Sequence, residues 1–384
     1  MKLEPEQKAM LNGEQGHVIA LALKTLVHYG KAFGAQRLVP IKSAHLAGSF
    51  GSISYSAYYI VLEQFIKAGL RVKVPTTINP RPGHDLNLLN RIAFGKQNAL
   101  DFKMQQLGVT PNYSCVCYEK DNVPNVGDCL AWSESSAVQF ANSVLGARTN
   151  RNSLLIDLCS AITGFTPEFG YLLDENRRGK IVVKLNINKM DPSALGFIIG
   201  KKVVSKVPVI EHYNFSRSDL KNMGGAMAAA GGIALFHVEG LTPEASDMKA
   251  AFAGVEPESI ITITQDDLDS LRANKTEHAD LVVFGCPQLN LEEACLLASK
   301  FSVKRVKKPA WFCMIPADKI NFEKTDLYKK IRTADIKVYT HCPLSALTVQ
   351  LRRKRVLTPS GKLFYYLESA EYADLDNCIR ACEA

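Results

Sequence analysis

The 384-residue sequence lacks the patterns that mark several large classes of protein. No apolar run reaches the roughly 18 residues that a membrane-spanning helix needs. The first residues, MKLEPEQKAMLNGEQG, are charged and contain no apolar core of the kind that an export signal requires. We therefore expect a cytoplasmic protein without a membrane partner.

Cysteine is present, but the paired spacings that give it a standard role are missing. The two closest of the ten cysteines, Cys115 and Cys117, are separated by one residue, and no CxxC pair occurs. This spacing argues against zinc ribbons and thioredoxin-type sites, and the scattered positions argue against a disulfide scaffold. The Gly- and Ala-rich segment 221–232 contains no GxGxxG motif, so a dinucleotide site is not indicated.

The sequence also lacks a basic surface interleaved with aromatic residues. Its net charge of +8 is modest, and the densest basic runs are 304–308 (KRVKK) and 352–355 (RRKR). Neither run contains the aromatic residues on which nucleic-acid bases stack, and such runs are typical of solvated surfaces. We therefore expect no nucleic-acid partner.

Short apolar strands and helical segments alternate along the chain. Segments 180–185 (KIVVKL) and 280–284 (DLVVF) are examples of the strands. This alternation predicts an α/β fold with largely parallel sheets flanked by helices. The length permits more than one lobe. A charged turn at 175–179 favours a boundary between an N-terminal lobe, 1–180, and a C-terminal lobe, 181–384.

The most distinctive segment is 131–151, AWSESSAVQFANSVLGARTNR. Its first half predicts a helix that Ser133 caps and Gly146 ends, with Ser136 or Glu134 binding free backbone N–H groups at the start. Beyond the helix, Arg148 and Arg151 flank a threonine and an asparagine. Guanidiniums in such a setting bind carboxylate or phosphate groups well. The alternative is a capped surface helix followed by a solvated basic loop, with one arginine favoured there by the helix dipole.

We predict a pocket for acidic groups of a substrate around these arginines. Loops that follow strands are where α/β proteins bind ligands, and here such loops follow the predicted strands 37–41 and 71–75. The N-terminus of the central helix adds further polar groups. The predicted substrate-binding residues are Lys42, Ser43, Asn79, Glu134, Ser135, Arg148, Asn150 and Arg151.

Three cysteines suggest a metal centre. Cys286 and Cys342 each end a predicted buried strand and precede proline, which keeps the backbone extended and helps to expose the sulfur. With Cys115, from the loop before the central helix, they could hold an iron–sulfur cluster with one iron open to a substrate hydroxyl. The alternative is that they are buried thiols that behave as small apolar side chains.

Several motifs together resemble the aconitase X family, a branch of the aconitase superfamily. They are spread over nearly the full length: MLNGEQG, LVPIKSAHLAG, VPTTINP, the central segment with AITGFTPEFG, ALFHVEGLTPEA, FGCPQL, THCP and SGK. The resemblance implies an aconitase-like, multi-lobed arrangement of sheets and an iron–sulfur hydro-lyase. It places Cys115, Cys286 and Cys342 as cluster ligands. The family's Thr-Cys-x-Pro-Tyr sequence is Ser-Cys-Val-Cys-Tyr here, so Cys117 is the alternative to Cys115.

Two activities occur in the family, and both remove water from a small hydroxy acid. We expect dehydration of mevalonate 5-phosphate to trans-anhydromevalonate 5-phosphate in an archaeal-type mevalonate pathway, because the predicted pocket has cations for a phosphate and a carboxylate. The alternatives are dehydration of cis-3-hydroxy-L-proline and a non-catalytic homologue that serves as a scaffold subunit. The resemblance also implies a heterodimer with a small swivelling-domain subunit, which supplies a serine as the catalytic base.

Overall fold

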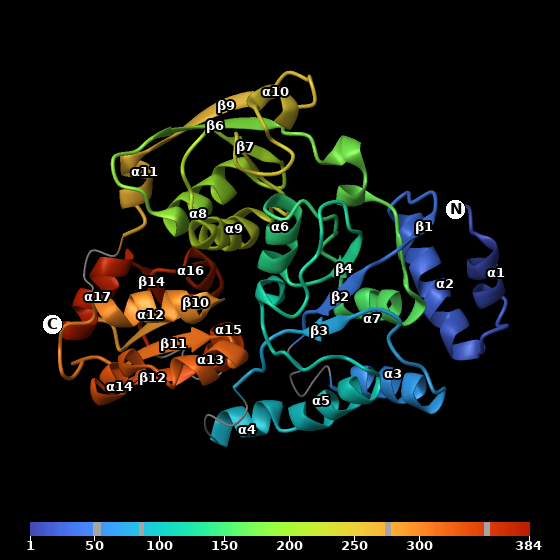
Figure 1. Cartoon of the computed structure of the whole chain (residues 1–384), viewed down its shortest axis with the longest axis horizontal. Helices are drawn as coiled ribbons and strands as arrows, with labels where there is room; N and C mark the ends of the chain where they lie inside the picture. The colour runs from blue at the N-terminus through green and yellow to red at the C-terminus, as the bar shows by residue number, and fades with distance from the viewer. Residues whose placement is uncertain (49–54, 84–87, 273–277, 349–353) are drawn as a thin grey trace.

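The computed structural model shows a mixed α/β protein whose described residues form four sheets with helices around them (Figure 1). It describes residues 1–48, 55–83, 88–272, 278–348 and 354–384. Residues 352 and 353 of the basic run 352–355 lie outside these ranges. None of the helices formed by the described residues combines the length and the apolar composition that crossing a bilayer would take. The predicted fold class, with largely parallel sheets flanked by helices, is confirmed.

The N-terminal part contains a three-stranded parallel sheet with β2 in its centre and a separate antiparallel pair. The strands are β1 (Leu38–Pro40), β2 (Ser43–Leu46), β3 (Thr76–Ile78), β4 (Leu130–Trp132) and β5 (Phe165–Pro167). The helices are α1 (Pro5–Leu11), α2 (His17–Ala32), α3 (Tyr55–Lys67), α4 (Leu88–Phe94), α5 (Gln97–Gln106), α6 (Ser135–Ser143) and α7 (Leu154–Thr163). Apolar side chains of α2, α3, α5 and α7 form one core with β2 and β3.

The main sheet of this part is built from segments that the sequence predicted to be loops. The predicted strand 37–41 contains β1, but β1 pairs only with β5, and the predicted strand 71–75 gives way to β3 just after it. The polar side chains of these strands made them look like loops in the sequence. Ser43 accepts a hydrogen bond from Trp132 Nε1 at 3.2 Å, and both ring nitrogens of His45 are bonded. Because these groups pair with one another, a polar segment can be fully buried.

The middle part contains a four-stranded parallel sheet in the order β8-β7-β6-β9. Its strands are β6 (Ile181–Asn186), β7 (Pro208–Ile210), β8 (His237–Val238) and β9 (Ser259–Thr264). Its helices are α8 (Pro192–Val203), α9 (Arg217–Gly231), α10 (Met248–Ala251) and α11 (Gln265–Asp269). In Figure 1, α8 and α9 lie between this sheet and the rest of the molecule.

The C-terminal part contains a five-stranded parallel sheet in the order β12-β11-β10-β13-β14. Its strands are β10 (Leu281–Leu289), β11 (Ala310–Met314), β12 (Ile336–Tyr339), β13 (Val356–Thr358) and β14 (Ala370–Tyr372). Its helices are α12 (Leu291–Lys300), α13 (Pro316–Phe322), α14 (Asp326–Thr333), α15 (Pro343–Thr348), α16 (Gly361–Tyr366) and α17 (Leu375–Glu383).

Strand β10 has a break that shapes the site described below. It pairs in register with β11 up to Phe284 and again at Leu289, but the register shifts between them. Gly285 lies in this break with a φ of +94°, and a Cβ added to it would lie 2.1 Å from the carbonyl oxygen of Cys313. Only glycine fits such a position. Cys286 therefore lies in an irregular part of β10 rather than at its end.

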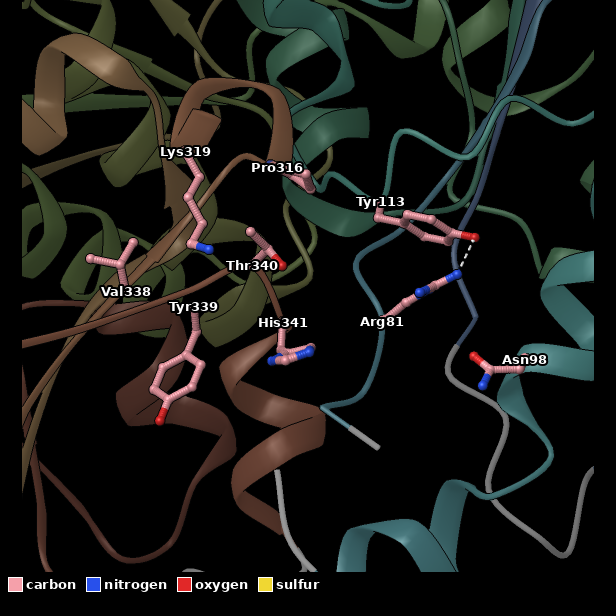
Figure 2. A pocket seen from close by; sticks show the side chains of 9 residues that line it. All are labelled: Arg81, Asn98, Tyr113, Pro316, Lys319, Val338, Tyr339, Thr340 and His341. Atoms are coloured by element: carbon pink, nitrogen blue, oxygen red, sulfur yellow. Dashed lines mark hydrogen bonds between the residues drawn. The ribbon is translucent and has the colours of Figure 1, made fainter. Parts of the chain in front are cut away.

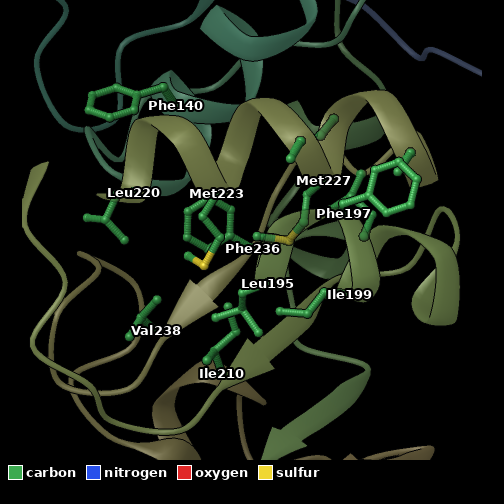
Figure 3. Packing of buried hydrophobic residues seen from close by; sticks show 14 of the residues in the cluster. Phe140, Leu195, Phe197, Ile199, Ile210, Leu220, Met223, Met227, Phe236 and Val238 are labelled. Atoms are coloured by element: carbon green, nitrogen blue, oxygen red, sulfur yellow. The ribbon is translucent and has the colours of Figure 1, made fainter. Parts of the chain in front are cut away.

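Helix α9 is the most connected helix of the core, packing on α6, α8, α16 and β10. Its contact with α8 requires glycine, because a Cβ added to Gly196 would lie 2.0 Å from the carbonyl oxygen of Met223. Figure 3 shows Met223 of α9 and Leu195 of α8 in the apolar cluster that joins these helices to β7 and β8. The close packing on α8 fixes the position of α9, and α6 and α16 pack against it.

Candidate active site

A cavity of about 370 Å³ opens between the three-stranded and the five-stranded sheets. Its wall comes from segments that follow β3, β4 and β12, from the irregular part of β10 and from α16. Ligands of α/β proteins bind at such strand ends. The cavity brings together seven of the residues that the sequence predicted: Asn79, Cys115, Glu134, Ser135, Arg151, Cys286 and Cys342.

Lys42 and Ser43 do not line this cavity. Lys42 is exposed, and its backbone N–H donates to the carbonyl oxygen of Cys129 at 2.8 Å. Ser43 is buried in strand β2, where its hydroxyl accepts the hydrogen bond from Trp132. Both were predicted from a loop that the structure replaces with a strand, so neither is carried into the proposed site.

Arg148 and Asn150 also lie elsewhere. Arg148 faces a different cavity and forms an ion pair with Asp174 at 2.5 Å. The Asn150 side chain donates to the carbonyl oxygen of Phe169 at 2.8 Å and accepts from the backbone N–H of Tyr171 at 2.9 Å. These contacts hold the segment after β5 in place. Of the two arginines that follow α6, only Arg151 reaches the cavity with the thiols.

The three predicted thiols line one cavity, with Cys286 buried and Cys115 and Cys342 partly exposed. Burial raises the pKa of Cys115 to about 12 and the pKa of Cys286 well above its ordinary value, and Lys362 partly opposes both shifts. Cys342 adds to the rise in both cases. With pKa values raised in this way, Cys115 and Cys286 stay protonated at neutral pH in the absence of metal, whereas a bound metal ionises a coordinating thiol. Cys115 and Cys286 are therefore poorly suited to act as free nucleophiles.

The donor set fits a cluster better than a single ion. No three His, Cys, Asp or Glu side chains within the described ranges are placed to hold one metal ion. An iron–sulfur cluster takes each thiolate on a different iron, so its ligands do not converge on one point. Three cysteines from three separate segments around one cavity meet that requirement.

Cys117, the alternative ligand, does not line the cavity. Its side chain is 1% exposed and packs in the core with Val116 and Tyr118. Burial raises the pKa of Cys117 well above its ordinary value, although a hydrogen bond with Thr77 opposes the shift. The geometry thus favours Cys115 as the ligand from this loop.

A buried ion pair forms part of the cavity wall. Lys362 Nζ lies 2.5 Å from Glu134 Oε1 and 2.8 Å from Ser136 Oγ. Burial alone would raise the pKa of Glu134, but Lys362 and hydrogen bonds from Ala137 and Ser136 outweigh it and lower the pKa. Burial would likewise lower the pKa of Lys362, but Glu134 and two of the thiols raise it. Both side chains are therefore charged at neutral pH.

The helix cap differs from the predicted one. Glu134, rather than Ser133, caps α6 by accepting the backbone N–H of Ala137 at 2.6 Å. Ser133 instead accepts the backbone N–H of Ala47 at 2.8 Å and donates to the carbonyl oxygen of His45 at 3.2 Å. The serine is used to join β2 to the segment after β4, so the longer glutamate side chain serves the helix.

Sequence reasoning missed Lys362, Gln288 and His45. A signal existed for Lys362, because it lies in the SGK motif and follows a glycine at a close approach. A Cβ added to Gly361 would lie 2.9 Å from Ala226 Cβ. Gln288 and His45 also belong to the motifs FGCPQL and LVPIKSAHLAG, but a lone glutamine or histidine in a motif does not reveal its partners.

His45 orients Asn79 in the cavity. Its Nε2 lies 2.9 Å from Asn79 Oδ1, and its Nδ1 lies 2.8 Å from Thr77 Oγ1. Burial lowers the pKa of His45 to about 4, so the ring is neutral at pH 7. A neutral ring that donates from Nε2 to Asn79 leaves the Asn79 amide group to face the cavity.

Asp157, behind the cavity wall, predicts a pH dependence of stability. Burial raises its pKa from 3.8 to about 8, while hydrogen bonds with Asn152 and Ser133 oppose the shift. The folded chain keeps a proton that the unfolded chain releases between these values, so stability falls as pH rises through this window. Asp157→Asn removes this titration. At pH 8 we expect its free energy of unfolding to exceed that of the wild type by at least about 1 kcal/mol, and its melting temperature to be higher. Melting curves of both chains at pH 5 and pH 8 check this. The same change in stability between the two pH values for both chains would contradict it.

A larger cavity of about 580 Å³ is a weaker candidate for the active site. Figure 2 shows Arg81 and Tyr113 on one side of it and Lys319 on the other. Both cations already have partners, since Arg81 lies 2.7 Å from Asp101 and Lys319 lies 3.0 Å from Glu323. No cysteine lines this cavity. The smaller cavity, with its thiols, is therefore the candidate active site.

Family models cover almost the whole chain. The models described as aconitase X first, second and third domain match residues 1–175, 179–273 and 279–384. Among solved structures, the crystal structure of Thermococcus kodakaraensis aconitase X (holo-form) is similar, with a TM-score of 0.88 and 33% sequence identity over 99% of each chain.

Curated relatives carry two names. The phosphomevalonate dehydratase large subunit of Methanocaldococcus jannaschii is 34% identical over 96% of both chains, and that of Methanothermobacter thermautotrophicus is 38% identical over 81% of this chain and 79% of the relative. The cis-3-hydroxy-L-proline dehydratase of Pseudomonas aeruginosa is 32% identical over 78% of this chain but only 54% of the relative.

Proposed function

Because the chain belongs to the aconitase X family, we propose that it is the large subunit of a hydro-lyase that dehydrates mevalonate 5-phosphate to trans-anhydromevalonate 5-phosphate. The observation that carries the proposal is the cavity that three thiols line together with Arg151 and Asn79. Support for the substrate comes from relatives of that name that match this chain over nearly their full length, whereas the hydroxyproline relative of Pseudomonas aeruginosa is matched over about half of its length.

We place an iron–sulfur cluster on Cys115, Cys286 and Cys342. When bound there, the cluster supplies a Lewis acid for the substrate hydroxyl. The thiols come from both proposed lobes, 1–180 and 181–384, so the site is complete only in the folded whole. None of the ten cysteines, all of which lie in the described ranges, forms a disulfide. That pattern is typical of a reducing compartment and supports a cytoplasmic enzyme.

Arg151 holds an acidic group of the substrate. It forms no ion pair with another described residue, so its guanidinium is available to a carboxylate or phosphate. Asn79, oriented by His45, and Ser135 add neutral hydrogen-bonding groups on the same cavity. The negative charge of Glu134 is balanced by Lys362 and does not repel the substrate.

Removing Arg151 should impair catalysis without impairing the fold. Arg151 is exposed in the open cavity, and a bound substrate would bury its charge pair. Truncating one partner of such a buried pair costs about 2–5 kcal/mol in binding, which is at least about a 30-fold loss of kcat/KM. Arg148→Ala is the matched control, because Arg148 follows the same helix but pairs with the exposed Asp174 outside the cavity. We expect Arg151→Ala to lose activity at an unchanged melting temperature and Arg148→Ala to stay near wild type. Equal kinetics for the two variants would show that Arg151 does not bind the substrate anion.

The catalytic base comes from the partner. Glu134 and Lys362 are locked together as a charged pair, so neither readily takes up a proton from the substrate at neutral pH. Relatives named as large subunits imply a small-subunit partner. We assign to that partner a swivelling domain that closes over the cavity and contributes a serine base.

The function is tested by assaying the chain alone and with its small subunit. Under anaerobic conditions we expect turnover of mevalonate 5-phosphate by the pair and little by the isolated chain, because the base is missing from this cavity. Chromatography of the unsaturated product measures the reaction. Parallel assays with cis-3-hydroxy-L-proline decide the substrate. Full turnover by the isolated chain would refute the two-subunit proposal, and an iron-free, inactive pair would point to a scaffold subunit.

A further inference from the structure

The Gln288 side chain joins three segments of the cavity wall. Gln288 lies two residues after Cys286 and is 1% exposed. Its Oε1 accepts the backbone N–H of Cys115 at 3.2 Å. Its Nε2 donates to the carbonyl oxygens of Met314 at 3.2 Å and Thr340 at 2.9 Å. One amide thus uses its acceptor and both donors on three separate parts of the backbone.

Each of the three thiols is close in sequence to one of these bonds. Cys115 is bonded directly, Cys286 precedes Gln288 by two residues, and Cys342 follows Thr340 by two residues. The backbone N–H of Gln288 also donates to Cys115 Sγ at 3.4 Å. The amide therefore acts on the spacing of all three sulfurs at once.

Gln288 is itself held firmly. The carbonyl oxygen of Gln288 accepts a hydrogen bond from Lys221 Nζ at 3.0 Å, and Lys221 forms a buried ion pair with Glu293. Lys221 lies on α9, so the position of Gln288 is fixed from the core below the cavity. A side chain anchored in this way can impose a geometry on the loops that it contacts.

An amide is the side chain that this position needs. The three contacted backbone groups comprise one donor and two acceptors, which a glutamine amide satisfies fully. An ionised carboxylate offers only acceptors, and an apolar side chain leaves all three groups buried without a partner. The hydrogen-bonding pattern, rather than the volume, therefore selects glutamine.

We propose that Gln288 is a positioning residue that sets the mutual spacing of Cys115, Cys286 and Cys342 for cluster binding. The proposal rests on the proposed function as an iron–sulfur enzyme and adds a residue through which the fold controls cluster retention. Partners that orient the ligands of a metal site change metal affinity by about 10- to 100-fold when they are removed.

The test uses Gln288→Met, which keeps the volume but loses the amide. Its matched control is Gln139→Leu, since Gln139 is fully buried and donates to the carbonyl oxygen of Ile233 but contacts no cysteine segment. The anaerobically reconstituted chains are titrated with an iron chelator while the visible absorbance is followed. We expect Gln288→Met to lose iron at about 10- to 100-fold lower chelator concentration and Gln139→Leu to retain it like the wild type.

Two further arms keep the result decisive. If Gln288→Met does not fold, Gln288→Asn, which keeps the amide but shortens its reach, replaces it and should also lose iron early. Wild-type retention in a folded Gln288 variant, or the same early loss in Gln139→Leu, overturns the positioning role. A wild-type chain that takes up no iron at all overturns the cluster itself and the positioning role with it, which separates the two failures.

Discussion

Cys286→Ser and Cys342→Ser are each expected to give a folded chain that holds no iron–sulfur cluster after anaerobic reconstitution. The two thiols and Cys115 line one cavity, and a cluster held by three protein thiolates loses a third of its protein ligands in either variant. Iron content per chain and the visible thiolate-to-iron absorbance measure the loss. Activity of the complete enzyme should disappear with the iron.

Cys295→Ser is the control for these variants. Cys295 is partly exposed on α12 and does not line the cavity, so its loss should leave the iron content unchanged. Cys115→Ser should behave like Cys286→Ser, whereas Cys117→Ser should keep its iron. Wild-type iron in Cys286→Ser and Cys342→Ser would refute the ligand assignment, and loss in Cys117→Ser alone would exchange Cys117 for Cys115.

The second large effect is expected on stability. Lys362→Met leaves the buried carboxylate of Glu134 without its counter-charge, and breaking a buried pair in this way costs about 3–5 kcal/mol. Chemical denaturation of wild type and variant measures the cost. The double variant Lys362→Met with Glu134→Gln also removes the unpaired Glu134 charge. It should recover part of the lost unfolding free energy, because the two effects are coupled.

Lys206→Met provides the comparison for an exposed pair. Lys206 lies 2.8 Å from Glu258, but both side chains are about half exposed, and such pairs contribute about 0–1 kcal/mol. The buried pair should therefore exceed the exposed one several-fold. Similar small losses for Lys362→Met and Lys206→Met would show that the cavity wall is hydrated enough to tolerate an unpaired Glu134.

The sequence was sufficient for the fold class and for the gathering of the thiols. Strand and helix periodicity indicated an α/β fold, and the Cys-Pro positions together with the family resemblance indicated which three cysteines would lie together. Strands β2 and β3 could not be foreseen, because Ser43, His45 and Thr77 look like loop residues until their partners across the sheet are known. Partners distant in the sequence are invisible to local pattern reasoning.

The residues of the anion pocket also could not all be predicted from the sequence, because their contacts depend on the fold. Nothing in the sequence distinguishes Arg148 from Arg151. In the structure, Arg148 pairs with Asp174, whereas Arg151 lines the cavity with the thiols. The two arginines are three positions apart in the sequence, and only the folded chain shows that they lie on different cavities. Lys362 was missed for a similar reason, since it meets Glu134 from more than two hundred residues away.

Helix α9 has a consequence for how the protein can change over time. It contributes no side chain to the cavity, yet α6 with Glu134, α16 with Lys362 and β10 with Cys286 all rest on it. A Cβ added to Gly225 of α9 would lie 3.0 Å from the Pro287 ring, next to Cys286. A scan of all single substitutions should therefore find the small residues of α9 among the least replaceable, although none of them meets a substrate. New substrates are more readily acquired by varying the cavity rim than by altering this helix.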